Sequence, residues 1–200
     1  MVRVSRRNVL KGTGALLAAG AGYPAFAQTP AAAADLIVRG ATILSMDSAI
    51  GDLPSGDIHI RGGVIVRVAP RIDIAGAEVI DATDMIAMPG LVETHWHMWN
   101  TLIRNMAGED EKTGYFPTQG AIGARFTPGD NARGVLLSIA EAIESGITTV
   151  HNWSHNLLQP DYADAEIEAM RSTGIRGRFS YGYSRNTKPN DTLPLDDILR

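Results

Sequence analysis

A short apolar strand that ends in two histidines constrains the fold of this chain more than any other feature. The apolar run covers residues 88–94, and His95 and His97 follow it with one residue between them. Side chains two apart on a strand project to the same face, so both imidazoles can reach one ion. Neutral imidazole is a common ligand of zinc and of other first-row metals. The pattern therefore predicts half of a metal site.

The residues around the two histidines place them at the carboxyl end of a buried strand. A Pro-Gly pair at residues 89 and 90 breaks the preceding element, and the Leu-Val pair that follows is typical of a buried strand. A polar stretch follows His97. Parallel β/α barrels carry their chemistry at this end of their strands. This context distinguishes the pair from two surface or packing histidines.

Residues 35–88 are predicted to form a small β-sandwich. Short β-rich runs, separated by Gly, Pro and Asp, are typical of hairpins and occur at residues 36–38, 42–46, 57–60, 64–68 and 78–81. A tight turn at residues 61–64 joins two of these runs. His59 lies on one of them and is interpreted as a solvated or packing residue.

From residue 89 onward, strands alternate with helices, which predicts parallel βαβ units. We expect strands at residues 91–94, 147–150 and 178–183, helices at 99–106, 127–145, 162–172 and 192–200, and a long loop at 107–126. A complete (β/α)8 barrel takes about 250 residues, whereas 111 residues run from Gly90 to Arg200. The predicted fold class is α/β, with about three strands of an incomplete TIM barrel in residues 89–200.

The sequence resembles the amidohydrolase superfamily, and within it the branch similar to cytosine deaminases and chlorohydrolases. The resemblance is carried by Met-Pro-Gly-Leu-Val running into His-x-His, by Phe-Thr-Pro-Gly-Asp at residues 126–130, and by residues 140–150. It extends from about residue 35 to the end of the chain and covers only the N-terminal portion of such proteins. The resemblance implies one metal bound by four histidines and an aspartate, of which this chain supplies His95 and His97.

The same resemblance implies hydrolysis of a non-peptide carbon–nitrogen bond, by deamination or by opening of a ring amide or amidine. A divalent metal, first of all Zn²⁺ with Fe²⁺ or Mn²⁺ as alternatives, lowers the pKa of bound water to about 7. The catalytic acid/base group is expected beyond Arg200, and the substrate is expected to be small and cyclic. The loop after His97 lacks the Trp-Leu segment expected of nucleoside-type deaminases, so no nucleoside is assigned.

Further candidate residues flank the two predicted metal ligands. Glu93 shares the strand parity of the histidines and is expected beneath them, where it either supports the metal ligands or anchors the strand, and the structural role is preferred. Residues near the carboxyl ends of predicted strands are expected to contact substrate: Trp99, Asn100, Trp153 and His155. Ligand sites are mostly apolar and aromatic with a few polar groups, and indole faces suit a planar ring. His151 shares this rim, whereas Trp96 has the opposite parity and is expected to pack.

The N-terminus carries a twin-arginine export pattern. Arg6 and Arg7 precede a Gly/Ala/Leu stretch at residues 12–21, and Ala-Phe-Ala at residues 25–27 marks a cleavage site. The stretch is shorter than the about 20 apolar residues of a membrane-spanning helix. We therefore expect residues 1–27 to be a signal peptide recognised by the twin-arginine export machinery, and residues 28–34 a disordered spacer. The expected location is the bacterial periplasm, without a stable membrane anchor after cleavage; a retained anchor is the alternative.

Charge and cysteine content exclude other classes of partner and ligand. Removal of residues 1–27 would take away four of the 18 basic residues and none of the 22 acidic ones, which leaves a formal charge of -8. A nucleic-acid partner is therefore not expected. The chain has no cysteine, so disulfides and thiolate ligands are excluded, and a metal must take nitrogen and oxygen donors.

Two alternatives stand beside the metal-dependent hydrolase. The first is a truncated, catalytically incomplete fragment that only binds metal, because three barrel strands leave two open edges that need pairing. The second is a dihydropyrimidinase-like binuclear hydrolase, which a carboxylated lysine on the fourth strand would identify. The expected partner is a small-molecule substrate, and the sequence leaves a homo-oligomer open.

Overall fold

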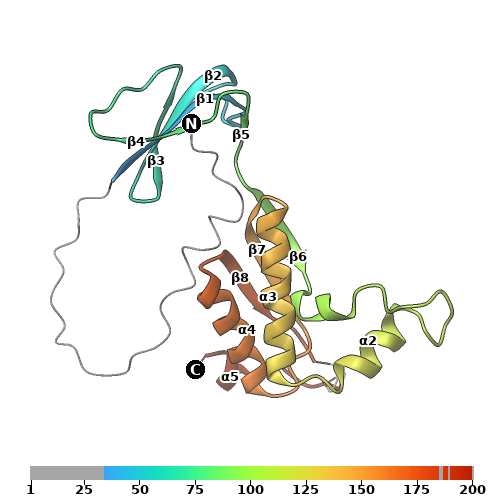
Figure 1. The fold of residues 1–200 in the computed structure, drawn as a ribbon. Helices are drawn as coiled ribbons and strands as arrows, with labels where there is room; N and C mark the ends of the chain where they lie inside the picture. Colours follow the sequence, from blue (N-terminus) through green and yellow to red (C-terminus); the bar gives the residue numbers. More distant parts are fainter. Residues whose placement is uncertain (1–33, 185–186, 189, 200) are drawn as a thin grey trace, which may run out of the picture. The chain divides into compact units, whose positions relative to one another are not determined.

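We describe the chain from a computed structural model that covers residues 34–184, 187–188 and 190–199. The predicted signal peptide and spacer residues 28–33 lie outside the described residues. Within the described part, no helix combines the length and apolar character needed to cross a membrane. The chain divides into two compact units (Figure 1): one contains the described residues up to Ile43 with Asp52–Ile86, and the other contains Leu44–Gly51 and the residues from Ala87 onward.

The first unit is built on a single sheet. Its strands are β1 (Asp35–Ile43), β2 (Leu53–Arg61), β3 (Val64–Ala69), β4 (Glu78–Asp81) and β5 (Ile86–Ala87). The strand order is β3-β2-β1-β4, and β5 pairs separately with β1. The β1–β2 and β2–β3 pairs are antiparallel, whereas β1 and β4 are parallel. The described strands form one sheet, so the β-sandwich predicted from the sequence is not confirmed.

Local chemistry explains the central strands of this sheet. Gly62 and Gly63 form the β2–β3 turn with φ angles of 58° and 78°, a conformation that glycine adopts without a steric cost. Alternate residues of β1 are buried and form the apolar core of the sheet: Ile37, Ala41 and Ile43. His59 is also buried, with Nε2 2.5 Å from Asp35 Oδ1. It is therefore an internal, hydrogen-bonded residue and is not solvated.

The second unit contains three parallel strands with helical connections. The strands are β6 (Leu91–Trp96), β7 (Ile147–Ser154) and β8 (Arg176–Tyr181), in the order β6-β7-β8. The helices are η1 (Met98–Ile103), α2 (Tyr115–Gly123), α3 (Pro128–Glu144), α4 (Pro160–Thr173) and α5 (Leu195–Ile198). Figure 1 shows α3 and α4 side by side along this sheet. The predicted α/β class with parallel βαβ units is confirmed, and closure into a barrel is not shown by the described residues.

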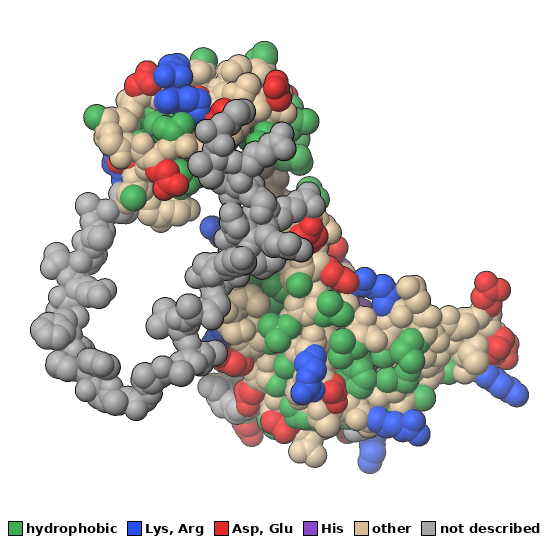
Figure 2. All heavy atoms as spheres, in the orientation of Figure 1, with side chains coloured by type: hydrophobic (Ala, Val, Ile, Leu, Met, Phe, Trp, Pro, Cys, Tyr) green, Lys and Arg blue, Asp and Glu red, His purple; other side chains and the backbone are tan. Residues whose placement is uncertain are grey.

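Helix α3 begins and packs as its sequence predicts. Thr127 Oγ1 accepts a hydrogen bond from Asp130 N at 3.2 Å, and Asp130 Oδ2 accepts one from Thr127 N at 2.9 Å, which makes a capping box. The buried side of α3 joins a core formed by Met98, Val135, Ile139, Ala142, Val150, Ala169 and Met170. Ile143, on the same helix, is 60% exposed. Apolar side chains therefore also reach the surface of this unit, where Figure 2 shows them among charged groups.

Two sequence predictions in the second unit were wrong in extent. Residues 107–126 were expected to be a loop, but they contain α2, whose Pro117 lies in the first turn, where a missing N–H costs no helical hydrogen bond. Strand β7 was expected to end at Val150, but it runs on to Ser154. His151 and Trp153 therefore lie within the strand, and His155 follows it directly.

Candidate metal centre

The two histidines at the end of β6 converge on one point. His95 lies on β6 and His97 follows it, and their Nε2 atoms are 3.3 Å apart. A tetrahedral zinc ion with Zn–N bonds of about 2.0–2.1 Å would hold two ligand nitrogens about 3.3–3.4 Å apart. The observed separation therefore fits a shared ion. Among the residues that the structure describes, no group of three or more His, Asp or Glu side chains could hold a metal ion.

A backbone carbonyl of the neighbouring strand fixes the protonation pattern of His97. Its Nδ1 lies 2.7 Å from the carbonyl oxygen of Trp153 on β7. Because a carbonyl oxygen only accepts hydrogen bonds, Nδ1 carries the proton and donates. In the neutral ring, Nε2 then keeps its lone pair. Metal-bound histidines are commonly held in this way, with the other ring nitrogen bound to a carbonyl or carboxylate.

The indole of Trp153 contacts the other histidine. Its ring stacks on that of His95, with centroids 5.0 Å apart and planes 26° apart, and 40% of the residue is exposed. The rings of His95 and His97 meet edge to face at 4.9 Å. One residue of β7 therefore contacts both histidines, through its carbonyl on one and its ring on the other.

Glu93 lies on the same strand as the histidines, two residues before the first of them. Its Oε1 accepts a hydrogen bond from the backbone N–H of His95 at 3.0 Å. The carboxylate thus holds the backbone where β6 delivers its first histidine.

His155 and His151 contact different parts of this region. The ring of His155 lies 4.2 Å from that of His97 in an edge-to-face arrangement, and its Nε2 is 2.6 Å from Nε2 of Gln119 on α2. His151 donates from Nδ1 to the carbonyl oxygen of Thr94 at 3.0 Å, and its Nε2 lies 2.6 Å from Ser180 Oγ. His151 thus links β7 to the strands on either side of it.

Trp99 and Asn100 are both predicted to contact substrate, but they lie in different environments. Trp99 is fully buried and packs edge-on against Phe126 and His155, with centroids 5.7 and 5.5 Å away. It lies in the interior and is not exposed to a ligand. Asn100 donates to the hydroxyl of Tyr115 at 3.1 Å and lines a cavity of about 260 Å³.

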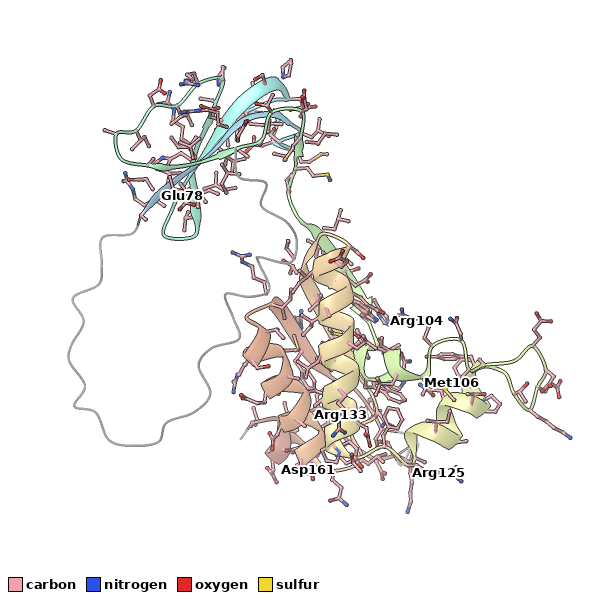
Figure 3. All side chains as sticks on the ribbon, in the orientation of Figure 1. Glu78, Arg104, Met106, Arg125, Arg133 and Asp161 are labelled. Carbon is pink, nitrogen blue, oxygen red and sulfur yellow. The ribbon has the colours of Figure 1, made fainter. Side chains whose placement is uncertain are left out.

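This cavity lies between η1 and α2. Its lining includes Trp96, Asn100, Arg104, Tyr115 and Gln119. Arg104, labelled in Figure 3, also pairs with Glu141 of α3, which ties the end of η1 to that helix. Gln119 reaches from the cavity wall to the ring of His155.

Sequence reasoning missed two polar residues of this region. Gln119 was missed because its segment was expected to be a loop. Glu166 was missed because a helical glutamate is normally solvated, yet it is fully buried on α4. Its spacing could have revealed it, since it falls three residues after Ala163 and three before Ala169, both buried on the same helix.

The comparisons with known proteins find relatives that are named as deaminases. No family model matches the chain. The chain is 32% identical over 154 residues to the 5′-deoxyadenosine deaminase of Methanosarcina barkeri, covering 74% of this chain and 33% of the relative. It is 33% identical over 173 residues to the 5-methylthioadenosine/S-adenosylhomocysteine deaminase of Symbiobacterium thermophilum, covering 82% and 37%. The chain thus spans about a third of the length of these curated relatives.

Solved structures of a hydrolase and a deaminase also match this chain. A triazine hydrolase from Arthrobacter aurescens matches with a TM-score of 0.66 and 25% identity, over 83% of this chain and 41% of the other. An adenosine deaminase from Xanthomonas campestris with bound zinc matches with a TM-score of 0.62 and 25% identity, over 74% and 34%. This chain is therefore similar to proteins named as deaminases and hydrolases, over 33–41% of their length.

Proposed function

We propose that this chain supplies two metal ligands, His95 and His97, to a hydrolase that cleaves a non-peptide carbon–nitrogen bond of a small molecule. The observation that carries the proposal is the convergence of their Nε2 atoms, 3.3 Å apart, with His97 Nδ1 already bound to a carbonyl. We propose that the remaining ligands and the acid/base group lie outside the described residues.

Zinc is the metal that this donor set favours. The chain has no cysteine, and imidazole nitrogens bind zinc well. Two of the matching structures, the Arthrobacter atrazine chlorohydrolase and the Xanthomonas adenosine deaminase, were crystallised with zinc. A divalent ion bound here would supply the Lewis acid that activates water near neutral pH.

The residues of this chain have defined parts in that reaction. The Trp153 carbonyl holds the proton of His97 on Nδ1, so that Nε2 is ready to bind without losing a proton first. The Trp153 indole restricts rotation of the His95 ring by stacking on it. The Glu93 carboxylate accepts a hydrogen bond from the backbone N–H of His95 and so holds the backbone at the first ligand. The ligand geometry is thus set before any ion arrives, which lowers the entropic cost of binding.

The substrate class proposed is a planar nitrogen heterocycle with a leaving group on a ring carbon. Among the relatives, the deaminases are named for adenosine derivatives and the hydrolases for triazines. Both names describe flat, nitrogen-rich rings. The exposed part of the Trp153 indole and the cavity beside Asn100 and Tyr115 offer apolar and hydrogen-bonding surface to such a ring.

Metal content tests the ligand assignment directly. We expect the purified chain to retain zinc in proportion to protein, as measured by elemental mass spectrometry, and the variant H95A/H97A to lose it. His59→Ala is the matched control, because His59 is a buried histidine of the first unit and is bonded to Asp35. Equal zinc in the double variant and in the parent chain would contradict the assignment.

We also propose export to the bacterial periplasm through the twin-arginine route, on the basis of Arg6, Arg7 and the Ala-Phe-Ala motif. The test is cell fractionation of the chain and of its R6K/R7K variant. Periplasmic protein only with the paired arginines is the expected result, and equal export of both forms would reject the proposal.

A further inference from the structure

We infer that Glu166 is a positioning residue of the metal centre: from the helix side of the sheet it holds Asn152 and Ser154, and the residue between them holds both histidines. The inference rests on the proposed function, because it assigns Glu166 a part in the same site. Glu166 itself contacts neither histidine and acts through Trp153.

Three side chains donate to the Glu166 carboxyl group. Asn152 Nδ2 donates to Oε2 at 2.8 Å, and Ser154 Oγ donates to Oε1 at 2.8 Å. Asn131 Nδ2, from α3, donates to Oε1 at 2.7 Å. All four residues are fully buried. The carboxyl group therefore joins α3 and α4 to the last residues of strand β7 in the interior of this unit.

The network continues toward α2. Asn156 Nδ2 donates to Asn131 Oδ1 at 3.2 Å and to the carbonyl oxygen of Gly123, the last residue of α2, at 3.1 Å. Buried hydrogen bonds restrict the groups that they join, and in this network one acceptor, Asn152 Oδ1, has no partner among the described residues. Glu166 is at the centre of this network, because Asn131 of α3 and two residues of β7, Asn152 and Ser154, all donate to its carboxyl group.

Strand alternation connects this network to the histidines. Asn152 and Ser154 face the helices, so Trp153 between them faces the other side of the sheet. With both neighbours fixed, the peptide groups on either side of Trp153 have little freedom to rotate. This fixes the direction of the Trp153 carbonyl, which accepts the hydrogen bond from His97 Nδ1. It also fixes the placement of the Trp153 indole against the ring of His95.

A carboxyl group suits this position better than an apolar side chain. Replacement by an apolar residue would take the carboxyl acceptor away from three buried donors. Asn131 Nδ2 would keep only its long contact to the carbonyl oxygen of Asn156 at 3.4 Å, and Asn152 Nδ2 only the sulfur of Met170 at 3.9 Å. Burial raises the pKa of Glu166, and the hydrogen bonds from Asn152, Ser154 and Asn131 oppose that rise. If the role were only structural, loss of these bonds would lower stability and leave the histidines as they are.

The test compares Glu166→Ala with Ser138→Ala in the 200-residue chain. Ser138 is a suitable control because its hydroxyl is equally buried in the second unit and bonds to Thr101 and Met98, away from Trp153. The first measurement is the tautomer of His97 in the metal-free protein, read from correlation spectra of the ring ¹⁵N nuclei. The second is zinc affinity, measured by competition with a chromophoric chelator.

We expect E166A to lose the single Nδ1–H tautomer of His97 and to bind zinc about tenfold or more weakly, as for loss of other residues that orient metal ligands. S138A should change neither. Glu166→Gln should restore both readouts, because Asn152 Oδ1, which has no hydrogen-bond partner among the described residues, can turn to accept from the new amide. E166A behaving like S138A would overturn the inference.

A milder variant covers the case in which E166A does not fold. Ser154→Ala removes one donor beside Trp153, so a smaller shift of the His97 tautomer is expected, and no shift would overturn the inference. The two measurements also separate the proposals. A tautomer change in a chain that binds no zinc would refute the metal site and leave the positioning of His97 standing.

Discussion

Each unit of the protein buries a carboxyl group, and the two are used differently. In the first unit, Asp57 accepts hydrogen bonds from the backbone amides of Gly40 and Ile72, both at 3.0 Å, and from Arg39. In the second unit, Glu166 accepts only from side chains. The donors to Asp57 lie in β1 and in the segment before β4. Two donors to Glu166, by contrast, flank a residue that faces the histidines.

This difference indicates that Asp57 stabilises its own unit, whereas Glu166 positions the residues around the histidines. Asp57 closes a local arrangement of β1, β2 and the segment before β4, and nothing in its contacts leads to a candidate site. Glu166 is connected through β7 to two potential metal ligands. Buried carboxyl groups of similar appearance are therefore distinguished by where their donors lie, and variants of each should separate the two roles.

The largest expected effect is on the stability of the first unit. Asp57→Ala leaves two buried amides and Arg39 without their acceptor, so we expect it to lower the free energy of unfolding by about 3 kcal/mol. Denaturant titration of the chain would measure this. Zinc affinity should stay at the parent value, and a fall in affinity with D57A would remove the contrast between the two carboxyl groups.

A smaller effect is expected in the second unit, on binding. Trp153→Ala keeps the carbonyl that holds His97 but removes the ring stacked on His95. We expect zinc affinity to fall about tenfold, equivalent to about 1.4 kcal/mol, as measured by chelator competition. Trp153→Phe, which retains a stacking ring, is the matched control. Equal affinity in W153A and the parent chain would show that the carbonyl alone positions the pair.

Much of the candidate site could be predicted from local sequence. The two-residue spacing of His95 and His97 determines that both rings share a face, and the Thr127–Asp130 capping box marks where α3 begins. These features depend on neighbours in the chain. The contact between His97 and Trp153 joins residues 56 positions apart. It depends on the register of β6 against β7, which short-range patterns do not encode.

Helix α2 and the burial of Trp99 could not be predicted from the sequence, for related reasons. Helix α2 has no apolar periodicity and contains Pro117 and Gly120, so its sequence resembles that of a loop. Trp99 is near the predicted strand end, but the close approach of η1 to α3 turns it inward. A Cβ atom on Gly134 would lie 2.4 Å from the Trp99 carbonyl oxygen, so this packing requires a glycine. Such constraints become visible only when both elements are in place.

The smallest expected effect is a difference in the pH dependence of the two units. Burial tends to raise the pKa of Asp57, but the amides of Ile72 and Gly40 and the Arg39 side chain lower it overall. Its contribution to stability is therefore complete above the unfolded pKa of about 4 and is lost as the pH falls through the folded pKa. Burial raises the pKa of Glu166, so its contribution to stability is complete below the unfolded pKa and is lost as the pH rises through the folded pKa.

Hydrogen exchange of β2 and β7 amides between pH 3 and pH 7 measures these two contributions. Protection against exchange should change with pH in opposite directions in the two strands. Asp57→Asn should abolish the pH dependence in β2, and Glu166→Gln should abolish it in β7. Parallel slopes in the two strands would mean that the two carboxyl groups differ in their neighbours but not in their electrostatic role.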